Sequence, residues 1–285
     1  MALSDSEVSK AELDRRAFRR SQRSRSVLVA FISTLVFAIL VWFGLVATPG
    51  WSRVQESFFS WDVAVQAWPR VLDGLLLNLR VLAVAAVLVV IFGLLIAVIR
   101  TLKSPVFFPL RVLAKGYVDL FRGMPLIIVL YLVGFGIPAL QIKGLTNNVL
   151  ILGTLAVIIT YSAYVAEVIR SGILTVHPSQ RAAARSLGLS HFQTLRHVVL
   201  PQALKRVTPP LLNDLVALIK DTGLVSILGV TDAVRAAQIQ TAKTFNYTPY
   251  VMAAIIFLLV TIPLTRWTDR MLRNSLEKQN AQGQA

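Results

Sequence analysis

The chain has 285 residues, of which 55% are hydrophobic, and its mean hydropathy is +0.67. A soluble domain is only about 45–50% apolar even with glycine counted, so the composition indicates an integral membrane protein. The chain contains no cysteine, which excludes disulfides, cysteine-ligated zinc and a cysteine nucleophile. The net charge of +15 raises the question of nucleic-acid binding, which depends on where the basic residues lie.

Five stretches contain no charged residue and approach the roughly 20 residues that a membrane-spanning helix needs. They are 27–47, 81–99, 123–142, 148–166 and 247–265. A sixth candidate, 209–230, is interrupted by Asp214, Lys220 and Asp221. If residues 1–26 lie in the cytoplasm, six crossings return the C-terminus there. Twenty-two basic residues then lie in cytoplasmic segments and six in outer ones, which the positive-inside rule favours. The positive charge therefore indicates topology, and no nucleic-acid partner is expected.

Residues 1–26 are charged and serine-rich, and we expect a cytoplasmic arm. The arginine pairs at 15–16 and 19–20 resemble a twin-arginine export signal, but the apolar run that follows is too long for a signal peptide and lacks a cleavage site. Residues 27–47 are therefore predicted to remain as a first membrane helix. The aromatic-rich segment 48–71 is predicted to lie at the outer membrane interface.

The fourth predicted span ends in polar residues. Thr160, Tyr164, Glu167 and Ser171 recur at helical spacing and share one face, which we expect to look inward and away from lipid. A plainer interpretation is also open for Glu167, because a pair with Arg170 one turn later is an ordinary helix contact.

A polar, basic segment follows between two apolar stretches, and it is predicted to be a loop at the membrane surface. The alanines at 182–184 favour a short helix, and Gly188 suits the left-handed conformation that ends one. Small side chains let the backbone of another protein approach closely, whereas a lipid-facing helix carries larger apolar residues. The segment is therefore predicted to dock a partner protein.

The candidate span 209–230 is the fifth in chain order, and it is expected to begin at Pro209-Pro210. It carries Lys220, Asp221 and Thr222 about ten residues in, near the middle of the bilayer. Charges at that depth are costly and usually mark a transport pathway or a lock between helices. Asn213 shares the face of Lys220, and Asp214 shares that of Asp221. Neighbours on a helix point about 100° apart, so Lys220 and Asp221 need other partners.

The polar loop carries the clearest family resemblance. Gln180-Arg-Ala-Ala-Ala-Arg-Ser-Leu-Gly188, nine residues, then Val198-Val-Leu-Pro201 resembles the signature loop of permease subunits of binding-protein-dependent ABC importers. That signature reads Glu-Ala-Ala, three residues, Gly, nine residues, Ile-x-Leu-Pro. Four further phrases are similar to the polar amino-acid uptake branch: Arg122-Gly-Met-Pro-Leu126, Ala163-Tyr-Val-Ala-Glu-Val-Ile-Arg170, Leu200-Pro-Gln-Ala203 and Leu218-Ile-Lys-Asp-Thr-Gly-Leu224.

The resemblance implies an all-α integral membrane protein with a MetI-like core of five helices at 72–265, preceded by one extra helix and followed by a cytoplasmic tail at 266–285. It further implies a multi-pass protein of the cell (inner) membrane that imports polar amino acids such as glutamate, glutamine or arginine. Its partners would be a second permease subunit, an external solute-binding protein and a dimer of cytoplasmic ATPases, and those ATPases would hold ATP and Mg²⁺, with no cofactor on this chain.

By similarity, the cytoplasmic loop 171–206 contains the helix that couples to the ATPase. The residues implied in coupling are Gln180, Arg181, Ala182, Ala183, Ala184, Arg185, Gly188, Leu200 and Pro201. The residues expected at the translocation path or a helix lock are Tyr164, Glu167, Asn213, Lys220, Asp221 and Thr222. Ala182 stands where the signature has glutamate, and Ser179 where it has glycine. Coupling is therefore expected to depend on shape, on backbone contacts and on Arg181 or Arg185.

Two other classes of protein were weighed. An ion-coupled secondary transporter also carries charges at mid-membrane, but it usually has more spans and an internal repeat, and no motif here has a second copy. An intramembrane enzyme is not supported, because the three histidines follow no catalytic or metal-binding spacing. The sequence also lacks the phosphate-binding loop G-x-x-x-x-G-K-[ST], so the energy for transport is expected from another subunit.

Overall fold

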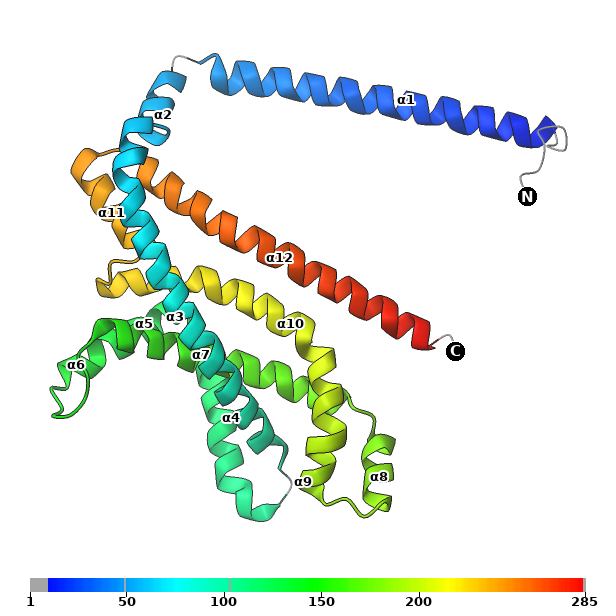
Figure 1. The fold of residues 1–285 in the computed structure, drawn as a ribbon, viewed down its shortest axis with the longest axis vertical. Helices are drawn as coiled ribbons and strands as arrows, with labels where there is room; N and C mark the ends of the chain where they lie inside the picture. Colours follow the sequence, from blue (N-terminus) through cyan, green and yellow to red (C-terminus); the bar gives the residue numbers. More distant parts are fainter. Residues whose placement is uncertain (1–9, 49, 103, 284–285) are drawn as a thin grey trace. The chain divides into compact units, whose positions relative to one another are not determined.

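The computed structural model describes residues 10–48, 50–102 and 104–283, so the predicted arm 1–26 and tail 266–285 fall partly outside it. Every regular element in these residues is a helix (Figure 1). The chain divides into two compact units, residues 1–57 and 58–285, which are described separately.

The first unit contains α1 (Lys10–Val41), a π-helical turn (Trp42–Val46) and most of α2 (Trp51–Phe58). α1 joins the end of the predicted arm to the predicted extra helix without a break at residue 26. Apolar side chains along it, including Phe31 and Phe37, are exposed. Exposed apolar side chains over this length suit a helix that meets lipid.

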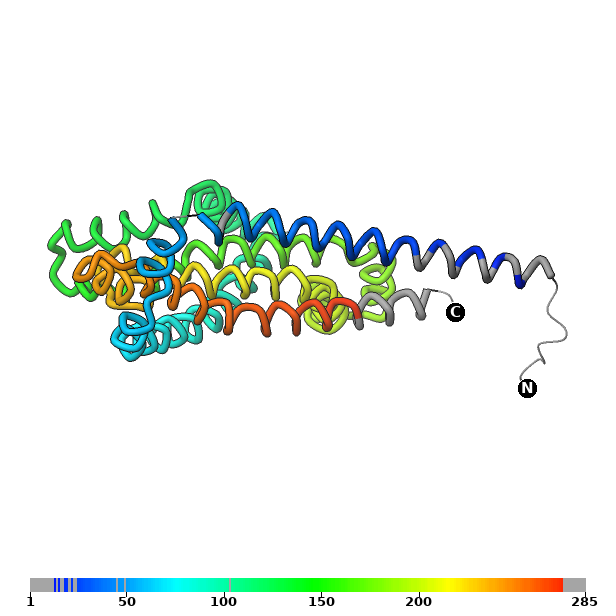
Figure 2. The backbone as a smooth tube through the Cα atoms, turned by 90° about the horizontal axis from the view of Figure 1, so that it is seen from above, coloured from blue at the N-terminus to red at the C-terminus, as the bar shows by residue number. Residues whose placement is uncertain are grey.

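The second unit is built on four long helices: α3 (Trp61–Thr101), α7 (Val149–Thr175), α10 (Leu200–Asp221) and α12 (Thr248–Gly283). α10 packs against both α7 and α12 (Figures 1 and 2). The shorter helices are α4 (Phe108–Gly123), α5 (Leu126–Tyr131), α6 (Ile137–Ala139), α8 (Pro178–Ser186), α9 (His191–Thr194) and α11 (Ala233–Thr244). Two π-helical turns (Leu132–Gly136 and Leu195–Val199) and two 3₁₀ helices (Pro105–Phe107 and Thr222–Leu228) complete it.

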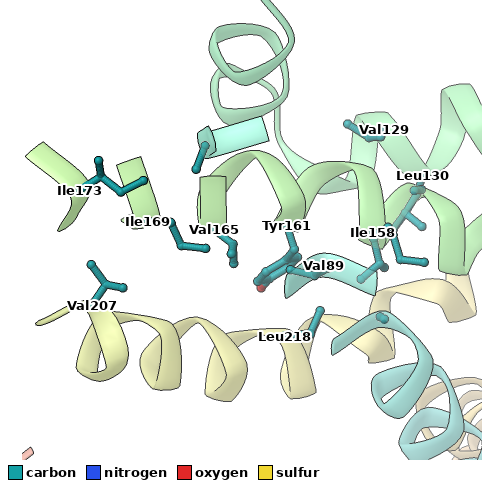
Figure 3. Close-up of a cluster of buried hydrophobic side chains, with 14 of the residues drawn as sticks. Val89, Val129, Leu130, Ile158, Tyr161, Val165, Ile169, Ile173, Val207 and Leu218 are labelled. Carbon is teal, nitrogen blue, oxygen red and sulfur yellow. The ribbon is translucent and has the colours of Figure 1, made fainter. Parts of the chain in front are cut away.

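α7 forms the centre of the core. Ile158, Val165 and Ile169 on this helix share one cluster with Val89 of α3 and Leu218 of α10 (Figure 3). Lipid is as apolar as these side chains, so close packing holds such helices together, with little contribution from transfer out of water. The core therefore fixes α7 against α3 and α10.

Four described helical segments are long and apolar enough to cross a membrane: Arg25–Gly44, Trp51–Thr101, Val149–Thr175 and Thr248–Arg273. A fifth counts if Pro105–Gly123 and Leu126–Ala139 form one span, and these two meet at a bend of 108°. The bend falls at Met124-Pro125, because proline restricts the residue before it to extended conformations.

Three predicted boundaries differ from the structure. α3 runs without interruption from Trp61 to Thr101, so no break separates the predicted external segment from the core at residue 72. Pro209 and Pro210 lie inside α10 and do not begin it. The predicted crossing 209–230 corresponds to the second half of α10 and the 3₁₀ helix after it, and its charged residues keep it below the apolarity of the other spans.

Candidate coupling loop and translocation-path residues

α8 is a defined helix with a signal at each end. The Nδ1 atom of His177 accepts a hydrogen bond of 3.2 Å from the Ser179 amide, and Pro178 occupies the first helical position, where its missing donor costs nothing. At the other end Gly188 has φ +82°. Its backbone N–H donates a hydrogen bond to Arg185 O, and the backbone N–H of Leu189 donates one to Ala184 O. This pair of bonds is a Schellman motif. The predicted short helix and the left-handed Gly188 are both confirmed.

The exposed surface of α8 carries mostly small or uncharged side chains, together with Arg185. Gln180, Ala182 and Ala183 are exposed, whereas Ala184 is buried against the rest of the protein. Leu187, just after the helix, is 83% exposed. These residues form a face on which another protein's backbone has room to approach.

The two arginines of α8 are engaged within the chain. Arg181 donates to the carbonyl of Ile173 at the end of α7. Arg185 donates to the carbonyl of Leu189, 3.1 Å away, in the turn that follows its own helix. Both arginines thus have a hydrogen-bond partner within the chain, and Arg185 remains on the exposed surface of α8.

The rest of the loop returns the chain to the membrane helices. Ser190 and Gln193 form a capping box at the start of α9. Leu200 is half-buried and packs against the core, and the exposed Pro201 lies in the first turn of α10, where proline is tolerated. The Leu-Pro pair thus marks the start of α10.

The second group of predicted residues, those expected at the translocation path or a helix lock, lies on α7, on α10 and at the start of the 3₁₀ helix that follows α10. The hydroxyl of Tyr161 donates a hydrogen bond of 2.7 Å to Asp221 Oδ2, which joins α7 to the last residue of α10. Thr222 is buried, and its hydroxyl donates to Ile219 O. Asn213 and Lys220 are exposed, and among the described residues neither has a bonded side-chain partner. Asp221 and Lys220 therefore have separate environments, as their spacing predicts.

Glu167 makes two ion pairs. Its Oε2 lies 2.6 Å from Arg100 Nη1 at the end of α3, and its Oε1 accepts from Arg170 on its own helix. The predicted contact with Arg170 is confirmed, and the bridge to Arg100 adds a link between α3 and α7. Charge-assisted pairs of this kind are the strongest polar contacts that link helices.

The predicted inward-facing polar stripe on α7 is only partly inward. Thr160 is buried, but Tyr164 and Ser171 are exposed in this chain. The Tyr164 hydroxyl donates to Arg122 O across 3.3 Å, and the Arg122 guanidinium lies 5.9 Å from its ring centroid. Glu167, between Tyr164 and Ser171 on the helix, is partly buried against Arg100.

Two residues were missed in the sequence. Tyr161 has the appearance of an ordinary aromatic in an apolar helix, and its partner Asp221 is sixty residues away. Arg100 has the appearance of a membrane-border cation. The one signal in the sequence concerned Asp221, which needed a partner from another helix or from water.

Comparisons with known proteins agree with this architecture. Residues 89–274 match the family of binding-protein-dependent transport system inner membrane components. The chain is 36% identical over 193 residues to a putative glutamine transport system permease protein of Rickettsia prowazekii (strain Madrid E), covering 67% of this chain and 86% of the relative. It is 33% identical over 198 residues to an arginine transport system permease protein of Bacillus subtilis (strain 168), covering 69% and 88%.

Solved structures give the same fold. A crystal structure of an amino acid ABC transporter with histidines aligns with a TM-score of 0.67 at 32% identity, over 75% of this chain and 98% of that one. The MetNI methionine ABC transporter aligns with a TM-score of 0.59 at 19% identity, over 72% and 95%, which supports the fold alone. The chain belongs to the inner membrane components of binding-protein-dependent ABC transport systems, and it is a multi-pass membrane protein with the MetI-like fold. The resemblance stated from the signature loop is confirmed.

Among the described residues, no group of three or more histidine, aspartate or glutamate side chains is arranged to hold a metal ion. The polar groups described above make contacts between helices or are exposed on α7, α8 and α10.

Proposed function

We propose that this chain is the permease subunit of an ATP-driven importer that moves polar amino acids such as glutamine or arginine into the cell. The observation that carries the proposal is the loop around α8, where the signature spacing produces an exposed helix of small residues closed by Gly188. The two relatives described above are named for glutamine and arginine transport, which supports the substrate class.

Partner proteins follow from the same loop. A cytoplasmic ATPase, which would carry ATP and Mg²⁺, docks on Gln180, Ala182, Ala183 and Leu187. Small side chains allow a close approach there, and the exposed Leu187 supplies an apolar anchor. Gly188 fixes the helix end, and Leu200 with Pro201 returns the chain to α10. An external solute-binding protein delivers the amino acid.

A second permease subunit, identical or related, covers the polar surface of α7 and α10. Exposed polar or charged side chains on membrane helices are costly against lipid, so they face water or another protein. Asn213 and Lys220 on α10 and Tyr164 on α7 are such side chains. We assign Asn213, Lys220 and Tyr164 to a water-filled path between the two permeases, and Glu167, Asp221 and Thr222 to contacts that hold the helices.

Reconstitution tests the proposal directly. The chain is expressed with an added affinity tag in the organism from which it comes. The assembly that co-purifies with it is placed in liposomes together with the binding protein. Uptake of labelled glutamine, arginine and glutamate is measured with ATP inside or outside the vesicle. We expect uptake that requires ATP on the ATPase side and survives ionophores. Uptake driven by an ion gradient without ATP would instead assign the chain to secondary transport.

A further inference from the structure

The C-terminus of α7 receives guanidinium groups from two other helices. Arg181 of α8 donates to Ile173 O, and Arg206 of α10 donates to Thr175 O at 2.7 Å. The last carbonyls of a helix have no partner within the helix, and they carry the negative end of its dipole. The end of α7 is thus tied at once to α8 and to α10.

Arg181 faces the interior of the loop and not the exposed surface of α8. It is half-buried beside the buried Ala184, and its Nε atom is enclosed without a hydrogen-bond partner. Arg181 also lines a small cavity together with Thr101, Ala182 and Leu195. A half-buried guanidinium with one strong acceptor loses that acceptor if α8 moves away from α7.

α7 and α10 are in close contact at the same level. A Cβ atom added to Gly172 would stand 2.2 Å from Val207 Cγ1 and 3.2 Å from Ala203 O. The absence of a side chain at Gly172 thus allows the two helices to pack closely at this point. Further along, the bond from Tyr161 to Asp221 joins the same pair again. A displacement at the end of α7 is therefore shared with α10.

We propose that Arg181 is the positioning residue that transmits the movement of α8 to the α7–α10 pair. It acts through its hydrogen bond to Ile173, and Arg206 holds α10 to the same helix end. The partner docks on the outer face of α8, and Arg181 on the inner face carries the displacement into the membrane helices. This inference rests on the proposed function, because it presumes that α8 is the helix on which the ATPase docks.

The test measures amino-acid uptake and ATP hydrolysis in the same liposomes for Arg181→Met, Arg181→Lys and Arg196→Met. We expect Arg181→Met to keep its basal ATP hydrolysis, since the outer face of α8 is unchanged. The amount of amino acid moved per ATP should fall by about fivefold or more, in the range of ordinary coupling energies. Arg181→Lys retains a cationic donor and should recover much of the ratio. Arg196 is an exposed arginine of the same loop, and its variant should match the unchanged protein.

A second measurement applies even if a variant fails to assemble. The chain has no cysteine, so spin labels can be placed at Leu174→Cys on α7 and Ser186→Cys on α8, both exposed positions. We expect one distance between the labels in the unchanged background and an added, longer population in Arg181→Met.

The outcomes separate the two proposals. A wild-type assembly with no ATPase and no ATP-dependent uptake would overturn the proposed function. A wild-type assembly that transports, together with an Arg181→Met variant that has a normal ratio and a single label distance, would overturn the role of Arg181 alone.

Discussion

The hydroxyl of Tyr161 and the carboxylate of Asp221 form a 2.7 Å hydrogen bond between the middle of α7 and the end of α10. Asp221 lies at the point where α10 gives way to the 3₁₀ helix Thr222–Leu228. The bond therefore holds the position at which the regular helix ends. Lys220, its neighbour in sequence, is exposed and takes no part in this contact.

We expect Tyr161→Phe to lower the stability of the protein by about 1–2 kcal/mol, because the half-buried Asp221 loses its donor. Tyr164→Phe is the matched control, since the Tyr164 hydroxyl is exposed and its bond to Arg122 O is 3.3 Å long. Thermal unfolding in detergent, followed by tryptophan fluorescence, measures both. Equal unfolding temperatures for the two variants would show that the bond to Asp221 contributes no stability.

We expect Lys220→Met to change substrate preference while leaving stability intact. The lysine is exposed and unpaired among the described residues, so its removal leaves no buried charge without a partner. Losing a cation from the path should favour basic over acidic amino acids. Uptake competition with glutamate, glutamine and arginine measures the preference, and thermal unfolding is the control. A lower unfolding temperature with the same preference would instead make Lys220 part of a lock.

The apolar spans could be predicted from the sequence because each is a long run without charged residues, and because capping residues indicate where a helix begins. Asn148 shows this at the start of α7, where its side chain accepts hydrogen bonds from the amides of Leu150 and Ile151. The turn at Gly188 could also be predicted, because only glycine adopts its positive φ without strain. Local chemistry decides both features.

The start of α10 and the polar contacts could not be predicted in the same way. Three prolines at 201, 209 and 210 suggest a late start, but the structure tolerates the last two within α10. The bonds from Tyr161 to Asp221 and from Arg100 to Glu167 depend on how helices distant in sequence pack. Sequence spacing predicted that Asp221 needs a partner other than Lys220 and that Glu167 can pair with Arg170, but only packing brings Tyr161 and Arg100 to them.

We expect Glu167→Gln to destabilise the protein by about 1–3 kcal/mol. The Glu167 and Arg100 side chains are 20% and 11% exposed. Their ion pair therefore lies between an exposed pair, which adds little stability, and a fully buried one, whose disruption is strongly destabilising. Removing the carboxylate leaves Arg100 and Arg170 without their counter-ion. Asp119→Asn, at an exposed position on α4, is the control. In a double-mutant cycle with Arg100→Met, a coupling energy near zero would contradict the link between α3 and α7.

We expect Gly188→Val to abolish transport while the protein still inserts and folds. A β-branched residue at φ +82° costs about 1–2 kcal/mol and redirects the end of α8. Gly116→Val is the control, because Gly116 lies within α4 and a Cβ there meets nothing within 4 Å. Co-purification of the ATPase and substrate-stimulated hydrolysis should both fall in the first variant only. Normal stimulated hydrolysis in Gly188→Val would remove this turn from coupling.

The orientation of the chain is tested by labelling single cysteines in the cysteine-free background. We expect Arg196→Cys, in the loop after α8, to react only when reagent enters the cytoplasm, and Lys143→Cys, between α6 and α7, to react from outside. Basic residues are retained on the cytoplasmic side during insertion, and the loop with Arg196 is rich in them. Both positions are exposed, so accessibility reports the side of the membrane rather than burial. Reaction of position 196 in intact cells with an impermeant reagent would contradict the orientation, and it would place α8 where no cytoplasmic ATPase can reach it.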